Sequence, residues 1–166
     1  MKTIVLIGMP GAGKSTVGAL LAKELGLGFI DTDILIQLRE KMTLKDIVQR
    51  SSYLALREIE EQVVLESEYS SKVVATGGSV IYSAKSMAKL KGSGKIVYLF
   101  CSVDSLRSRI HNFDTRGIAA PIDQQLEDLA EVRTILYEQY ADYTVDVSSK
   151  APAKIVEEIL QFNLET

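Results

Sequence analysis

The stretch GMPGAGKS at residues 8–15 fits the pattern Gly-x-x-x-x-Gly-Lys-Ser/Thr and carries most of the information about the fold. It follows a short apolar run at 3–7 and opens a helical pattern at 15–25, the strand-then-helix context that this pattern requires. Its glycines allow successive N–H groups to turn inward around a phosphate, and the helix N-terminus adds partial positive charge there. In such a loop Lys14 reaches the β and γ phosphates, and the hydroxyl of Ser15 ligates Mg²⁺. The flanks disfavour the alternative, a glycine-rich turn that binds nothing.

Length and composition limit the class of protein. The 166 residues fit one domain, so we expect a single domain over 1–166, long enough to bury a core without disulfides. A net charge of −3 gives no general attraction for nucleic acid. Cys101 is the only cysteine and His111 the only histidine, which excludes an internal disulfide and any cysteine-cluster metal site. Without a membrane-spanning run or a recognisable signal peptide, we expect a cytoplasmic protein with no membrane partner, and nothing in the sequence demands an oligomer.

Short apolar runs alternate with longer periodic stretches along the chain. Runs without polar alternation indicate strands that are buried on both faces, and we expect them at 3–7, 72–76, 95–100 and 143–147, with a weaker one at 28–31. Helical patterns are expected at 15–25, 33–40, 44–50, 52–69, 83–91, 104–111, 124–141 and 151–162. Alternation of this kind predicts an α/β fold in which helices cover both faces of a parallel sheet. The segment 112–123 has no clear period and is interpreted as a mobile loop, the lid.

Ligands of open α/β sheets bind beyond the carboxyl ends of the strands, and polar residues follow several of the predicted strands. Asp31 and Asp33 follow the second strand, where one carboxylate can help to hold hydrated Mg²⁺ and the other can accept the proton of an attacking hydroxyl. Alternatively, either aspartate merely caps the next helix. Gly77 and Gly78 follow the third strand and allow close backbone approach, with a plain tight turn as the alternative.

Three arginines are candidates for binding an anionic ligand. Arg116 lies in the lid, where it could swing onto the transferring phosphoryl group. Arg57 and Arg133 could clamp a carboxylate. Glutamates surround both of them in the sequence, so the alternative interpretation is that each belongs to a salt-bridged helix face.

Taken together, these residues resemble the shikimate kinase family of small-molecule kinases along the whole chain. The resemblance rests on an ordered set of motifs: GMPGAGKST at 8–16, DTD at 31–33, LREIE with Arg57, ATGG at 75–78, Arg116, Arg133, Tyr137 and Ala141-Asp142. It implies a P-loop NTPase-type three-layer sandwich with a five-stranded parallel sheet and a mobile lid. The implied reaction is ATP-dependent phosphorylation of the 3-hydroxyl of shikimate, with ATP and Mg²⁺ as cofactors.

The resemblance also implies roles for individual residues. The metal would be held by Ser15 and, through water, Asp31, and the catalytic residues would be Lys14, Asp33 and Arg116. ATP would be bound by Gly11, Ala12, Gly13, Lys14, Ser15, Thr16, Arg109, Arg116 and Pro152. The acceptor would be bound by Asp33, Arg57, Gly77, Gly78 and Arg133.

The chain departs from the usual pattern of the family at three places. Ser79 stands where a third glycine is usual, Gly117 where proline is usual after the lid arginine, and Ile135 where proline is usual after Arg133. These departures affect the acceptor pocket and the lid rather than the phosphate site. Alternatives are therefore a kinase for another hydroxy acid or amino alcohol, such as gluconate or homoserine, and a nucleotide-binding protein with little catalysis. A nucleoside monophosphate kinase is disfavoured because no second arginine-rich stretch is present to bind an acceptor phosphate.

Overall fold

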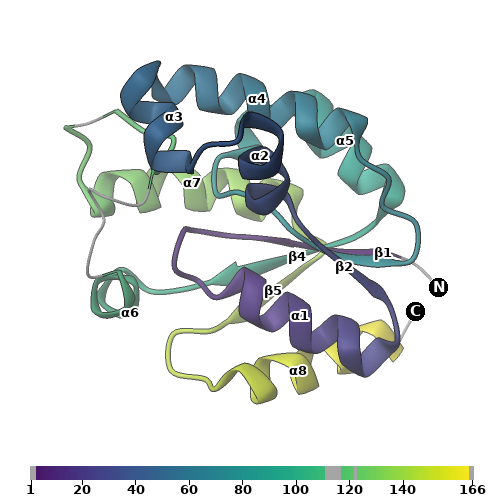
Figure 1. Ribbon diagram of the computed structural model, residues 1–166. Coiled ribbons are helices and arrows are strands. Elements are labelled where there is room, and N and C mark those ends of the chain that lie inside the picture. Colours follow the sequence, from purple (N-terminus) through teal and green to yellow (C-terminus); the bar gives the residue numbers. More distant parts are fainter. Residues whose placement is uncertain (1–2, 111–116, 122, 165–166) are drawn as a thin grey trace.

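The computed structural model describes residues 3–110, 117–121 and 123–164. A parallel sheet of five strands in the order β2-β3-β1-β4-β5 forms its centre (Figure 1). The first strand pairs with both of its neighbours along its length, with Val5 opposite Val74 on one side and Ile96 on the other. The strands are β1 (Thr3–Ile7), β2 (Gly28–Asp31), β3 (Lys72–Ala75), β4 (Gly94–Phe100) and β5 (Tyr143–Asp146).

Helices cover both faces of the sheet, as the alternating pattern predicts. Figure 1 shows α1 and α8 below the sheet and α4, α5 and α7 above it, with α6 beside the edge at which the phosphate loop turns. The expected three-layer α/β fold is thus confirmed. The helices are α1 (Lys14–Leu25), α2 (Thr32–Glu40), α3 (Leu44–Arg50), α4 (Tyr53–Glu66), α5 (Ala84–Ser93), α6 (Val103–Arg109), α7 (Leu126–Tyr140) and α8 (Pro152–Leu164).

Local sequence explains where the helices begin and end. Gly26 ends α1 in the left-handed conformation, φ 64°, that glycine adopts without strain. The side chain of Thr43 accepts a hydrogen bond from the N–H of Asp46 and starts α3. The expected helix 52–69 stops at Glu66, three residues early, because Ser67 adopts an extended backbone conformation. A short 3₁₀ turn, η1 (Val80–Tyr82), was not predicted.

Two hydrophobic clusters divide the interior. The larger surrounds the sheet, where every residue of β1 is buried. The smaller lies beneath α2, α3 and α4 and consists of Ile36, Ile47, Leu56, Val63 and Ala119. Since Ala119 belongs to the predicted lid, this part of the lid is packed against the helices that carry Asp33 and Arg57.

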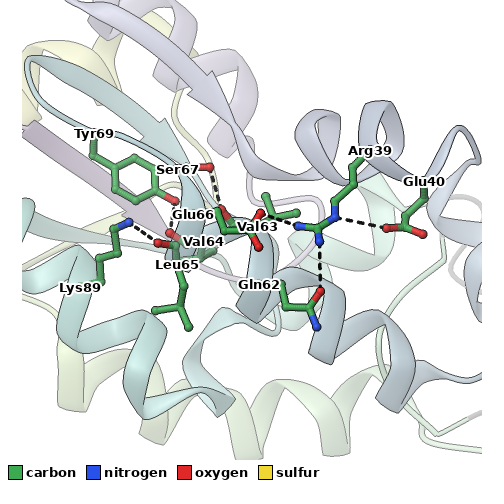
Figure 2. A network of polar contacts seen from close by, with 10 residues as sticks. All are labelled: Arg39, Glu40, Gln62, Val63, Val64, Leu65, Glu66, Ser67, Tyr69 and Lys89. Carbon is green, nitrogen blue, oxygen red and sulfur yellow. Dashed lines mark hydrogen bonds and ion pairs between the residues drawn. The ribbon is translucent and has the colours of Figure 1, made fainter.

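Polar contacts join α2 to α4 and close the end of α4 (Figure 2). The guanidinium of Arg39 donates to Glu66 Oε2 at 2.8 Å and to Gln62 Oε1 at 3.2 Å. These contacts are exposed and add little stability. At the end of α4, Tyr69 and Lys89 donate to the carbonyls of Val64 and Leu65. No helix in the described part of the chain is long and apolar enough to cross a membrane.

Candidate active site

A cavity of about 410 Å³ lies beyond the carboxyl ends of β1, β2 and β3. Among the described residues it gathers most of the predicted site: Gly11, Gly13, Lys14, Ser15, Thr16, Asp33, Gly77, Gly78, Arg109 and Arg133. Leu44, Leu56, Glu60, Ser79, Ile118 and Ala119 also line it. Arg116 and His111 lie outside the described residues. The cavity therefore brings together groups that are more than a hundred residues apart in the sequence.

The phosphate loop has the backbone geometry that its glycines predict. Gly8, Gly11 and Gly13 have positive φ angles of 148°, 85° and 92°, and no side chain caps α1 at Gly13. Lys14 Nζ donates to the carbonyl oxygens of Gly8 and Met9 at 2.7 and 2.9 Å. Burial lowers the pKa of Lys14 to about 8, although the charge of Asp33 opposes this effect. The loop thus presents a helix N-terminus and a buried ammonium group to the same space.

The two aspartates after β2 have different roles in the structure. Asp31 caps α2, because its Oδ1 accepts from the N–H groups of Asp33 and Ile34 at 3.0 and 3.4 Å. Its second oxygen accepts from Ser15 Oγ at 2.5 Å, so Asp31 also reaches the phosphate loop. Asp33 caps nothing and faces the cavity. Burial raises the pKa of Asp33 to about 6, an effect that the charge of Lys14 reduces and that of Asp31 increases.

Arg57 and Arg133 converge on one oxygen atom. Arg57 Nε and Nη2 donate to the carbonyl of Ala119 at 3.2 and 2.9 Å, and Arg133 Nη2 donates to the same carbonyl at 3.0 Å. The ring of Tyr82 supports both guanidinium groups, at 3.9 Å from Arg57 and 5.5 Å from Arg133. Arg133 is completely buried, so its interpretation as part of a surface salt bridge is wrong.

Gly77 and Gly78 are required by close approach of side chains. A Cβ atom at Gly77 would lie 2.1 Å from Glu60 Oε1, and one at Gly78 would lie 2.9 Å from Arg133 Nη1. The N–H of Gly77 already donates to Thr32 Oγ1 at 3.1 Å. The expectation that both glycines offer N–H groups to an acceptor remains a prediction.

Tyr137, one of the residues that carry the resemblance, is completely buried. Its hydroxyl is buried and donates to the carbonyl of Gly78 at 2.5 Å, and its ring stacks on Tyr98 at 4.9 Å between centroids. Burial raises the pKa of this hydroxyl well above its usual range. The contact holds the backbone at the floor of the cavity.

Glu60 and Ser79 also line the cavity, although no motif in the sequence assigned a role to Glu60. Glu60 is 3% exposed and lines the cavity, whereas Glu61 points elsewhere and accepts from Ser83 at 2.5 Å. Burial raises the pKa of Glu60 to about 7, and the charge of Asp33 contributes to the rise. The spacing of Arg57 and Glu60, which places both on one side of α4, was the signal in the sequence.

The remaining predicted residues lie at the periphery. Arg109 lines the cavity and donates to the carbonyl of Val147 at 2.6 Å. Pro152 begins α8, is exposed and does not line the cavity, so its place beside adenine stays a prediction. Ile135 is 66% exposed and does not line the cavity, so this departure from the family pattern lies outside the acceptor pocket. Gly117 has a φ of 66°, a conformation that proline cannot adopt.

Comparisons with known proteins agree with this geometry. The family model described as shikimate kinase matches residues 10–163. A shikimate kinase of Sulfurihydrogenibium sp. (strain YO3AOP1) is 35% identical over 161 residues, 96% of this chain and 96% of that protein. Shikimate kinase 2 of Serratia proteamaculans (strain 568) is 33% identical over 171 residues, 99% of this chain and 98% of that protein. The solved structure of shikimate kinase from Acinetobacter baumannii in complex with shikimate matches with a TM-score of 0.91 at 33% identity, covering 99% of this chain and 94% of that one. The resemblance inferred from the motifs is confirmed over nearly the whole length.

Proposed function

This chain belongs to the shikimate kinase family, and from that premise we propose that it transfers the γ-phosphoryl group of ATP to the 3-hydroxyl of shikimate. It is a small-molecule kinase with an alcohol acceptor. The residues proposed to bind nucleotide and acceptor that line the cavity all belong to one chain, which supports the proposal that the protein acts as a monomer, and we expect no nucleic-acid or membrane partner. We expect it to act in the cytoplasm, where ATP is available.

The observation that carries this proposal is the convergence of Arg57 and Arg133 on the carbonyl of Ala119. Two guanidinium groups aimed at one oxygen form a site for a carboxylate, because planar N–H forks bind carboxylate oxygens in pairs. A carbonyl carries only a partial charge, so an anionic acceptor would displace it readily. Arg133 also lines the cavity that holds Lys14 and Asp33, which supports an acceptor that is both a carboxylic acid and an alcohol.

Asp33 is the proposed general base. Its carboxyl lines the same cavity as Lys14, and its raised pKa of about 6 makes it a better proton acceptor than an ordinary aspartate while leaving it ionised at neutral pH. In the proposed step the acceptor hydroxyl gives its proton to Asp33 while its oxygen attacks the γ-phosphorus. Lys14 balances the charge on the phosphate oxygens.

The phosphate loop fits a magnesium nucleotide. A hydroxyl and a carboxylate oxygen, from Ser15 and Asp31, meet at 2.5 Å beside the loop, and such oxygens are the ligands that Mg²⁺ prefers. Ser15 would hold the ion directly and Asp31 through water. When bound, Mg²⁺ supplies charge that neutralises the phosphate oxygens during transfer.

The test is a coupled assay of ADP release with shikimate, gluconate, homoserine or nucleoside monophosphates as acceptors. Activity with shikimate alone supports the proposal. Activity with gluconate or homoserine alone would identify a related kinase, and nucleotide binding without acceptor-dependent turnover would identify a binding protein. Arg133→Ala should raise the KM for shikimate by about tenfold or more with little change in the KM for ATP, because a charged contact is lost. Arg107→Ala, on the exposed side of α6, is the control and should leave both constants unchanged.

A further inference from the structure

The departure at Ser79 creates a contact that a glycine at this position would lack. Ser79 lies immediately before η1 and is 7% exposed, and its hydroxyl donates a hydrogen bond to Glu60 Oε2. Glu60 is itself 3% exposed. Both residues line the cavity that contains Lys14, Asp33 and Arg133. The proposed transfer chemistry uses neither of them.

The second oxygen of Glu60 has no hydrogen-bond partner among the described residues, although it is buried. A Cβ atom added at Gly77 would lie 2.1 Å from this Oε1 and 2.9 Å from Asp33 Oδ1, so both oxygens lie against the Cα of Gly77. An unpaired buried carboxylate oxygen is costly, since desolvation is not repaid by a hydrogen bond. A polar hydrogen of a bound molecule would remove that cost. The same molecule would then lie within reach of the proposed base.

We propose that Ser79 is a positioning residue for acceptor recognition: its hydroxyl holds Glu60 so that Oε1 accepts a hydrogen bond from an acceptor hydroxyl that is not phosphorylated. This inference rests on the proposed function and adds the carboxylate of Glu60 as the group that binds a second hydroxyl of the acceptor. The reacting hydroxyl faces Asp33, and the carboxylate faces the two arginines. Glu60 lines the same cavity as Asp33 and Arg133, and in this proposal it contacts a third part of the acceptor, another hydroxyl of the shikimate ring.

The serine acts through geometry and charge. A hydrogen bond to one oxygen leaves the carboxyl group little freedom to rotate, so Oε1 stays against Gly77 beside Asp33, and both of these residues line the cavity. The same bond favours the ionised form of Glu60, and so do the charges of Lys14 and Arg133, whereas burial and the charge of Asp33 favour the protonated form. Arg57 and Tyr137 also lie close enough to interact with this carboxyl. Glycine at 79 would leave Glu60 without its hydroxyl partner.

The test compares acceptors that differ by one hydroxyl. Steady-state kinetics are measured with shikimate and with its 4-deoxy and 5-deoxy analogues for the wild type, Ser79→Ala and Ser79→Gly. We expect the wild type to prefer shikimate over one of the analogues by at least about 10²-fold in kcat/KM. The analogue that lacks the hydroxyl bound by Glu60 would leave the buried Oε1 unpaired, and an enzyme site rejects such an analogue strongly. Both variants should lose about tenfold of that preference through a higher KM for shikimate, with the KM for ATP unchanged. Equal effects of alanine and glycine would assign the loss to the hydroxyl rather than to side-chain volume.

A double-mutant cycle tests whether Ser79 acts through Glu60. In the Glu60→Gln background, Ser79→Ala should cause no further loss of preference, since the group that it positions is gone. Glu61→Gln is the matched control: it changes the neighbouring carboxylate, which bonds Ser83 outside the cavity, and should leave the preference unchanged. Thermal melts confirm that each variant is folded.

The outcomes separate the two proposals. If the wild type does not phosphorylate shikimate at all, the proposed function and this inference fail together. If the wild type is active and prefers shikimate, but folded Ser79→Ala retains the full preference, only the role of Ser79 is refuted. Additive losses in the cycle would likewise overturn it, because Ser79 would then act without Glu60.

Discussion

Replacing Asp33 by asparagine should stabilise the protein at neutral pH and abolish most of its turnover. Burial raises the pKa of this carboxyl from 3.8 to about 6. At about 1.4 kcal/mol for each pKa unit, keeping it ionised in the folded state costs roughly 3 kcal/mol. The pKa of about 6 already includes the attraction to Lys14, and asparagine resembles the neutral carboxyl, so we expect a gain of about 3 kcal/mol, or roughly 6 to 12 °C in Tm. Turnover should fall by about 10²-fold or more, with ATP affinity near normal.

The size of this gain in stability depends on pH. Because the folded-state pKa of Asp33 lies above its unfolded value, the contribution of the group to stability is full below about 3.8 and is lost as pH rises through about 6. The gain in Asp33→Asn should therefore be complete at pH 7 and disappear towards pH 4.

Melting curves of the nucleotide-free protein at pH 4, 5.5 and 7, combined with the ADP-release assay, measure both effects. Asp31→Asn is the control and should gain no stability, because that carboxylate is already satisfied by N–H groups of α2 and by Ser15. A variant that is less stable at pH 7, or equally stabilised at pH 4 and pH 7, would refute the burial argument. Wild-type turnover would refute the assignment of Asp33 as the base.

Three further predictions concern the same cavity. Gly77→Ala should lower the free energy of unfolding by about 1 to 3 kcal/mol in denaturant titrations, because its Cβ would lie 2.1 Å from a buried carboxyl oxygen. Gly92→Ala, in α5 with no heavy atom within 4 Å, should be neutral or stabilising. Ser15→Ala should raise the Mg²⁺ concentration for half-maximal turnover by about tenfold, measured by magnesium titration at saturating ATP. The plot of kcat/KM for ATP against pH should rise through about 6 as Asp33 ionises and fall through about 8 as Lys14 loses its proton; a flat profile would contradict both values.

The order of the elements could be predicted from sequence because it depends on local patterns. The apolar runs, the glycine at 26 and the cap at Thr43 act within a few residues of themselves, and the strands and helices begin and end close to the expected positions. The helix 52–69 was predicted too long: it ends at Glu66, where Ser67 turns extended, and Lys89 of α5 donates to the carbonyl of Leu65 in its last turn. Periodicity did not reveal η1, which follows the two glycines and places Tyr82 beneath the arginines.

The sequence by itself determined the phosphate loop, since its function resides in consecutive backbone amides and one lysine, and the α/β alternation that places this loop at the end of a strand. Only the tertiary structure decided which charged residues are buried and what they face. The glutamates near Arg133 in the sequence are equally compatible with a surface position, yet the side chain is completely buried, and it shares the ring of Tyr82 with Arg57. Asp31 and Asp33 were equivalent as capping candidates until the hydrogen bonds separated them. Burial and charge pairing arise from contacts between segments distant in sequence, and such contacts exist only once the sheet has brought β1, β2 and β3 together.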